Sequence, residues 1–452
     1  MLDNVVCSLG ASIVYQQGLK GLYPAKAMKM LQAGFNIMDR AMPTISCIRC
    51  SGMHSHEVYL SVMRKFTTLL IGLLTTATII SNSDALAASK WNDDDLHRIV
   101  EEAVRPLMAE QKIPGMAVAL TIDGKSRFFG YGVASAESGQ KIDENTIFEI
   151  GSVSKTFTAM LGGYGLATGA FSLSDPATKW APELSGSSFD KITMLDLGTY
   201  TPGGLPLQFP DAVTDDSSML AYFKKWKPDY PTGTQRRYSN PSIGLFGYLA
   251  ARSMDKPFDV LIEQKLLPAF GLKNTFVNVP ESQMKNYAYG YSKANKPIRV
   301  SRGALDAQAY GIKTTALDLA RFVELNIDSS SLEPDFQKAV SATHTGYYHV
   351  GANNQGLGWE FYSYPTTLKT LFAGNSSDMA LKSHKIETFS QPLQPSGDVL
   401  INKTGSTNGF GAYVAFIPTK KTGIVLLANR NYPISERIKT AYRILQALDK
   451  KQ

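Results

Sequence analysis

The chain has 452 residues, a formal net charge of +7 and no run of five or more lysines or arginines. Hydrophobic residues make up 44% and charged residues 19%, which is ordinary for a soluble globular protein and names no function. No basic helix carries interleaved aromatic side chains, so the excess positive charge gives no indication of nucleic-acid binding.

Residues 63–87 have the pattern of a secretory signal peptide. Two basic residues precede the 12-residue apolar stretch Leu69–Ile80 and small residues follow it, so cleavage is expected after Ala87. The apolar stretch is too short for a comfortable membrane span. We therefore expect a periplasmic protein without a stable membrane anchor.

The 62 residues before this segment do not fit a signal peptide, which should begin a protein. We interpret Met63 as the true start and residues 1–62 as a non-native upstream extension. The single Cys-x-x-Cys has no second pair, which favours an accidental match over a metal or redox site. Residues 1–87 hold seven basic and four acidic residues, so the rest keeps 39 basic and 35 acidic residues, a net charge of +4. All three cysteines lie in the removed part: Cys7, Cys47 and Cys50.

The exported part opens with a helical pattern over 94–108 and two strand-like runs, 116–122 and 127–133. The Asp-Gly pair at 123–124 separates these runs and predicts a β-hairpin. Over 152–167 apolar residues recur at i, i+3, i+4 and i+7, which predicts a helix with one buried face.

Residues 172–358 have mostly helical patterns and long loops, whereas the far end returns to strands at 398–403, 412–417 and 423–428 before a last helix at about 435–447. Strand-forming segments therefore lie at both ends of the exported part. The sequence predicts an α+β fold, in which an antiparallel sheet built from both ends is flanked by helices and a mainly helical domain is inserted.

Ser152 and Lys155 open the helical pattern of residues 152–167. Side chains three positions apart on a helix are neighbours, and the free N–H groups at a helix start favour a developing oxyanion. Ser152 is therefore a candidate nucleophile, and Lys155 can be its base if burial or a nearby like charge lowers the pKa of the amine. The Ser-x-x-Lys matches at 188–191 and 282–285 open no long apolar-periodic helix.

Two further motifs carry side chains that suit the same chemistry. Tyr-Ser-Asn at 238–240 is the only Tyr-x-Asn in the chain. Next to two ammonium groups the pKa of this phenol would fall from its usual value of about 10, so that its oxygen could take and return protons. Lys-Thr-Gly at 403–405 ends a strand-like run. The second Lys-Thr-Gly, at 421–423, is explained by a turn, and no strand leads into His-Thr-Gly at 344–346.

Residues that would support other hydrolytic mechanisms are scarce. The exported part has no cysteine and four histidines, none in a metal-ligand pattern such as His-Glu-x-x-His. Zinc hydrolysis and a cysteine nucleophile are thereby disfavoured, and we expect no metal and no cofactor. The number of histidines does not exclude a Ser-His-Asp triad, but a triad would leave the lysine and tyrosine motifs unexplained.

In this order, the motifs at 152–155, 238–240 and 403–405 resemble those of the class C serine β-lactamases. The likeness extends over about residues 90–450, and the absence of Ser-Asp-Asn argues against class A. The matching segments are GSVSKTFT at 151–158, GGLPLQ at 203–208, RRYSNPSIGLFG at 236–247, LDAQAYG at 305–311, QGLGWE at 355–360 and NKTGSTNGFGAYVAFIP at 402–418.

The resemblance implies a catalytic region over 88–452, with an α/β part at about 88–150 and 360–452 and a mainly helical part at about 151–359. The site would lie in the cleft between the two parts. The family further implies a monomer that hydrolyses the amide bond of small-molecule β-lactams, with a preference for cephalosporins, and so gives antibiotic resistance.

By resemblance, Ser152 is acylated by the lactam carbonyl while Lys155 and Tyr238 share the proton transfers. Lys403 would help to lower the tyrosine pKa and bind the substrate carboxylate, and the N–H groups of Ser152 and Ser406 would form the oxyanion hole. The family does not settle which group is the base for deacylation. The expected substrate-binding residues are Gln208, Asn240, Tyr310, Thr404, Gly405, Ser406, Asn431 and Arg437.

Two positions depart from the family pattern. Ile434 stands where many class C sequences have a second asparagine, and Asn402 stands where a histidine is common. An apolar side chain cannot hydrogen-bond a carboxylate, so recognition of that group would rest more on Lys403, Thr404 and Asn431.

Two alternatives share part of the pattern. A D-alanyl-D-alanine carboxypeptidase or related esterase has the same fold but often differs in the Lys-Thr-Gly element, so Lys403 favours the lactamase. A penicillin sensor that is acylated without turnover would need a true membrane span and a cytoplasmic effector. For the membrane span the chain offers only the 12-residue apolar stretch, and for the effector only the 62 residues before Met63, in which we find no recognisable pattern.

Overall fold

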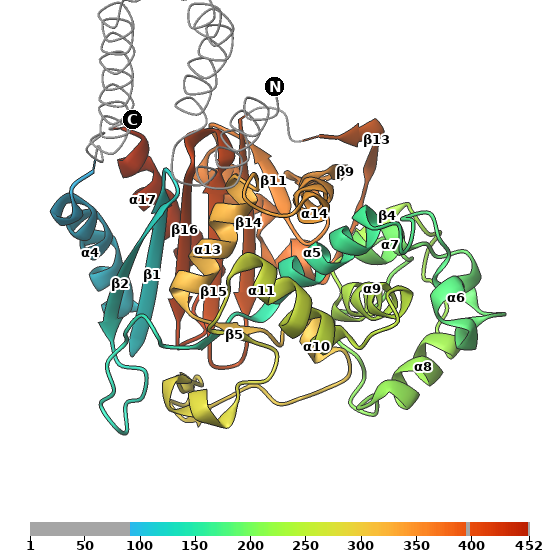
Figure 1. Ribbon diagram of the computed structural model, residues 1–452, viewed down its shortest axis with the longest axis horizontal. Coiled ribbons are helices and arrows are strands. Elements are labelled where there is room, and N and C mark those ends of the chain that lie inside the picture. The colour runs from blue at the N-terminus through green and yellow to red at the C-terminus, as the bar shows by residue number, and fades with distance from the viewer. Residues whose placement is uncertain (1–90, 395–397, 451–452) are drawn as a thin grey trace, which may run out of the picture. The chain divides into compact units, whose positions relative to one another are not determined.

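The computed structural model describes residues 91–394 and 398–450, and the residues from Asp94 onward form one compact unit (Figure 1). The predicted upstream extension, signal peptide and Cys-x-x-Cys fall within residues 1–87, outside the described residues. None of the helices in the described ranges is both long and apolar enough to cross a membrane.

A nine-stranded sheet has the strand order β13-β9-β10-β11-β14-β15-β16-β1-β2, and all neighbouring strands in it pair antiparallel. Strand β1, from the beginning of the unit, pairs with β16 near its end, with Met116 opposite Ala428. The prediction of a sheet built from both ends is confirmed. The strands are β1 (Gly115–Ile122), β2 (Lys125–Gly132), β9 (Gly346–Val350), β10 (Asn353–Gln355), β11 (Glu360–Ser363), β13 (Glu387–Leu393), β14 (Val399–Ser406), β15 (Gly411–Ile417) and β16 (Thr422–Ala428).

Helices cover the sheet and form the other side of the unit, where Figure 1 shows α6, α8 and α9 far from β1 and β2. The longer helices are α4 (Asp93–Glu110), α5 (Ser154–Ala167), α8 (Asp216–Lys225), α9 (Asn240–Ser253), α13 (Ala316–Ile327), α14 (Pro334–His344) and α17 (Ile434–Asp449). The shorter ones are α6 (Ala177–Trp180), α7 (Met194–Gly198), α10 (Phe258–Leu261), α11 (Leu267–Phe270), α12 (Asp306–Ala309), α15 (Leu368–Gly374) and α16 (Ser377–Leu381).

Short strands outside the large sheet fasten the loops between the helices. They are β3 (Phe148–Glu149), β8 (Lys313–Thr314) and β5 (Thr275–Phe276) in one sheet, β12 (Ser383–Lys385) with β4 (Gln235–Arg237), and β6 (Gly290–Tyr291) with β7 (Pro297–Ile298).

Two predicted turns join strands of the large sheet. Asp123 and Gly124 connect β1 to β2 with φ of 50° and 73°, the backbone that a tight hairpin needs. Lys421 lies exposed between β15 and β16, also with a positive φ, 46°. The second Lys-Thr-Gly therefore begins in a hairpin turn, as the sequence predicts, and continues into β16.

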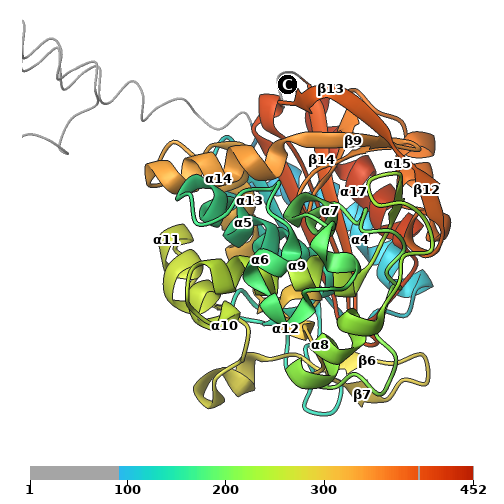
Figure 2. The same cartoon turned by 90° about the vertical axis from the view of Figure 1, so that its right-hand side faces the viewer.

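Helix α5 lies between two hydrophobic clusters. The first joins the sheet to α10, α11, α13 and α14 and includes Phe157 and Met160, and the second fills the helical side and includes Ala159. Figure 2 shows α14 lying along α5. The prediction of one buried face is wrong, because every residue from Ser154 to Gly163 is buried.

The expected division of the chain into two parts also needs correction. Strands β9 and β10 belong to the large sheet, although they lie within residues 151–359, which are expected to be mainly helical. Helix α13, from the same stretch, packs on β1 and β16. The helical and sheet parts therefore share segments within one unit and do not separate at residue 360.

Two glycines let the turn before α5 touch strand β14 backbone to backbone. A Cβ atom on Gly405 would lie 1.9 Å from the Ile150 carbonyl oxygen. A Cβ atom on Gly151, whose φ is +50°, would lie 2.4 Å from the Ser406 nitrogen. Only glycine tolerates these approaches. They place Ser152, on the 3-10 turn Gly151–Val153, beside the end of β14.

We predict that Gly405→Ala destabilises the protein far more than Gly346→Ala, a matched change in β9 of the same sheet. A Cβ atom at Gly346 would meet its nearest neighbour at 3.5 Å, an ordinary contact. Urea unfolding should show a loss of at least about 3 kcal/mol for Gly405→Ala and within about 1 kcal/mol for Gly346→Ala. Equal losses would mean that the turn and β14 separate without strain.

Candidate active site

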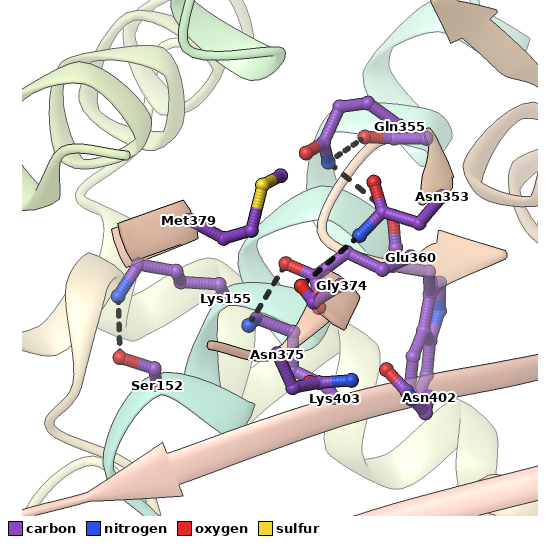
Figure 3. Close-up of polar contacts among 12 residues, drawn as sticks. Ser152, Lys155, Asn353, Gln355, Glu360, Gly374, Asn375, Met379, Asn402 and Lys403 are labelled. Atoms are coloured by element: carbon purple, nitrogen blue, oxygen red, sulfur yellow. Dashed lines mark hydrogen bonds and ion pairs between the residues drawn. The ribbon is translucent and has the colours of Figure 1, made fainter. Parts of the chain in front are cut away.

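A cavity of about 620 Å³ lies beside the turn that carries Ser152. This volume is within the range of about 300–1,000 Å³ that is usual for small-molecule sites. Segments far apart in sequence form its wall: the end of β14, the start of α9, the loop after β7, and α16. Figure 3 shows Lys155 pointing to Ser152, with Lys403 and Glu360 nearby.

Lys155 lies in the first turn of α5 and is fully buried. Its ammonium group donates to Ser152 Oγ at 2.9 Å, to Asn240 Oδ1 at 2.6 Å and to the Ala309 carbonyl oxygen at 2.7 Å. Burial lowers the pKa of Lys155 to about 8, with Lys403 adding to the decrease and Tyr238 opposing it. A substantial fraction of this amine is neutral near physiological pH and can accept the Ser152 proton.

Tyr238 lies between β4 and α9, where the sequence fixes the backbone. The Ser239 hydroxyl caps α9 by accepting from the Ser242 N–H group, and Pro241 occupies the first turn, where no intrahelical donor is needed. This cap orients both neighbours of Ser239, so that Tyr238 and Asn240 line the same cavity.

The Tyr238 phenol is buried among cations. The Nζ atoms of Lys155 and Lys403 lie 5.1 and 5.0 Å from its ring centroid, and the Arg236 guanidinium lies at 5.5 Å. Burial alone would raise the pKa of Tyr238, but Lys155 and Lys403, with a contribution from Ser152, outweigh it and hold that pKa below its usual value. The phenol oxygen makes no hydrogen bond of regular geometry within the described residues.

Glu360, which sequence reasoning missed, holds the charged side chains together. Its Oε1 atom lies 3.4 Å from Lys403 Nζ and 3.3 Å from Arg236 Nη2, and all three side chains are buried. Burial alone would lower the pKa of Lys403, but Glu360 and then Tyr238 raise it overall. The only signal in the sequence is a lone carboxylate in the segment QGLGWE, which contains no other charged residue.

Most of the expected substrate-binding residues line the cavity. Asn431 and Ser406 are exposed at its wall, and Ile434, the first residue of α17, lines the same cavity as a half-buried apolar side chain. The expected residues that line the cavity are Gln208, Asn240, Tyr310, Thr404, Gly405, Ser406 and Asn431.

Arg437 is the exception, and its expected contact with substrate is wrong. Its side chain is fully buried and does not line the cavity. Its guanidinium donates to the Gly405 carbonyl oxygen at 2.5 Å, to Ser406 Oγ at 3.0 Å and to Asn431 Oδ1 at 2.7 Å. Arg437 therefore holds cavity residues in place from behind.

The arrangement combines the parts needed for attack on a carbonyl group. The Ser152 hydroxyl has a partly neutral amine at hydrogen-bond distance, and a phenol of lowered pKa lies in the same cavity. The Ser-x-x-Lys segments at 188–191 and 282–285 lie at separate 3-10 turns, Ser188–Asp190 and Glu281–Asn286, and do not line this cavity.

Comparison with known proteins agrees with this chemistry. The family model described as Beta-lactamase matches residues 100–449. A β-lactamase of Pseudomonas fluorescens is 56% identical over 355 residues, covering 78% of this chain and 99% of that protein.

Solved structures give the same result. A class C β-lactamase in complex with cefoxitin has a TM-score of 0.76 and 45% identity, covering 78% of this chain and 99% of that one. A structure described as D-alanine carboxypeptidase AmpC from Burkholderia cenocepacia has a TM-score of 0.76 and 47% identity, covering 79% and 100%. With a family model matched over most of its length, the chain belongs to the β-lactamase family, as a class C serine enzyme.

Proposed function

We propose that this β-lactamase prefers cephalosporins and works through an acyl-enzyme on Ser152. The observation that carries the mechanism is the 2.9 Å contact between Lys155 Nζ and Ser152 Oγ, made by a buried amine whose pKa is lowered to about 8. The neighbour in complex with cefoxitin supports the substrate preference.

In acylation, Ser152 Oγ attacks the lactam carbonyl carbon and its proton passes to Lys155 or Tyr238. The lactam C–N bond then breaks, and the nitrogen receives a proton from the same pair. The N–H groups of Ser152 and Ser406 stabilise the oxyanion, an assignment supported by the close approach of Gly151 to the Ser406 nitrogen. Water completes the cycle by hydrolysing the ester.

The remaining residues orient the substrate. Asn240 uses its Oδ1 atom to accept from Lys155, which leaves its NH₂ group for the substrate amide oxygen. Gln208, exposed at the cavity wall, contacts the acylamido side chain of the substrate as well. The apolar Ile434 cannot hydrogen-bond the substrate carboxylate. This group is therefore bound by Lys403, Thr404 and Asn431.

The second candidate is a D-alanyl-D-alanine carboxypeptidase, which is supported by the similar structure from Burkholderia cenocepacia described as a D-alanine carboxypeptidase. We predict that the purified protein beginning at Ala88 turns over a chromogenic cephalosporin, and that mass spectrometry during turnover finds a transient adduct on Ser152. Ser152→Ala should abolish both signals. A stable adduct without turnover, together with cleavage of a peptide ending in D-Ala-D-Ala, would establish the peptidase instead.

The two Lys-Thr-Gly segments provide a matched test of the charge assignment. Lys403→Ala should lower kcat by at least about 100-fold, because it removes a cation beside the Tyr238 phenol, and Tyr238→Phe should do the same. Lys421→Ala should stay within about twofold of the wild type, since Lys421 lies in an exposed turn. Steady-state kinetics with circular dichroism to verify folding would measure this. Equal losses at the two lysines would refute the role of Lys403.

The proposed location is the periplasm, where the exported enzyme acts as a monomer. Residues 63–87 support this proposal because they have the pattern of a cleaved signal peptide. N-terminal sequencing of the protein released by osmotic shock should read from Ala88. A chain that retains Met1 in the membrane fraction would contradict the signal-peptide assignment and favour the penicillin-sensor alternative.

A further inference from the structure

Glu360 is a buried carboxylate in the active-site cavity that takes no step in the mechanism above. It lies on β11 opposite Asn402 of β14, next to the Lys-Thr-Gly segment, and is 5% exposed. A buried carboxylate is costly unless it is paired, and Glu360 is paired with two cations at once, Lys403 and Arg236.

The geometry points to Glu360 as a positioning residue that holds Lys403 against Tyr238 and balances the charge around the proton-transfer groups. This inference rests on the proposed serine mechanism and adds a carboxylate to it. Lys403 Nζ donates to Glu360 Oε1, and no other hydrogen bond of this ammonium group is present in the described part of the chain. The carboxylate thus fixes where the ammonium charge stands.

Arg236 makes Glu360 a rigid support. The guanidinium donates to Gln355 Oε1 at 2.7 Å and to the Met379 carbonyl oxygen at 2.9 Å, as well as to Glu360. It is 2% exposed and is tied to β10 and α16 at once. Figure 3 shows three of the residues concerned, Gln355, Met379 and Glu360. Arg236 therefore helps to hold the Glu360 carboxylate, whose Oε1 atom is also the contact of Lys403.

The charges that face Tyr238 come from four elements. Lys155 of α5, Lys403 of β14 and Arg236 of β4 supply three cations, and Glu360 of β11 is the carboxylate that acts on the phenol. Three further phenols pack against the cluster, and burial raises the pKa of each, so that they stay neutral: Tyr200, Tyr362 and Tyr413.

The sign of the effect follows from Coulomb's law. Beside the larger effect of burial, the Glu360 carboxylate raises the pKa of Tyr238, of Lys155 and of Lys403. Removing its charge lowers all three, so both limbs of the bell-shaped pH profile of kcat/KM should move to lower pH. The limbs belong to the coupled cluster and not to single residues. Loss of packing alone would lower the rate without moving either limb.

The test is the pH profile of kcat/KM for a chromogenic cephalosporin, measured for wild type and Glu360→Gln. The amide keeps the shape of the side chain and removes its charge. The ratio of kcat/KM at about pH 5.5 to that at about pH 8.5 should rise by at least about threefold. Glu360→Asp, which keeps the charge, should restore the limbs even where its maximal rate is lower. Asp318→Asn is the control, because Asp318 is a half-buried carboxylate of α13 that bonds only Asn274 and Thr275 among the described residues.

A folded Glu360→Gln variant with wild-type limbs would overturn the inference. If that variant does not fold, Arg236→Gln is measured instead. Removing this cation should move both limbs of the pH profile to higher pH. Unchanged limbs in a folded Arg236→Gln variant would also overturn the inference. Hydrolysis that survives Ser152→Ala would instead refute the proposed mechanism. Fixed limbs in an enzyme that depends on Ser152 would refute only the role of Glu360.

Discussion

The active site depends on keeping positive charge buried beside a phenol. Lys155, Lys403 and Arg236 are each at most 2% exposed, and burial of an ion costs several kcal/mol unless partners replace its water. The replacements are specific: an amide oxygen and a main-chain carbonyl for Lys155, and the Glu360 carboxylate for Lys403 and Arg236. What remains uncompensated is a positive field at Tyr238, which lowers the pKa of the phenol, while burial lowers that of the neighbouring amine. A serine between these groups can lose its proton near neutral pH.

The fold supplies this site by bringing rigid elements into backbone contact. Helix α5 carries Lys155 and lies between two hydrophobic clusters, so it cannot move without disturbing both. Gly151 and Gly405 allow the preceding turn to touch β14, and Arg437 holds the Gly405 carbonyl oxygen from behind. A nucleophile supported on such elements keeps its geometry better than one on a loop.

Local patterns in the sequence were enough to find the residues that lie in regular, chemically distinctive surroundings. Ser152 lies in the 3-10 turn that leads into α5 and Lys155 in the first turn of α5, the Asp-Gly hairpin pairs β1 with β2, and the C-terminal strands have continuous apolar runs. Long-range contacts left no such pattern. Glu360 contacts Lys403, 43 positions away in the sequence, and Arg236, 124 positions away. Helix α5 is buried on all sides because two hydrophobic clusters meet there, and a periodic apolar pattern predicts only one buried face. The wrong expectation for Arg437 has the same cause, since a charge near a site in sequence can lie behind its wall.

The most direct measurement is the titration of Tyr238 itself, followed by NMR of protein labelled with ¹³C at the tyrosine ζ carbon. The resonance absent from Tyr238→Phe identifies the residue. The buried cations predict that this resonance titrates below the usual tyrosine value of about 10. A Tyr238 resonance that stays in its neutral form up to about pH 10 would contradict the account, because the phenol could then neither accept nor return protons at neutral pH.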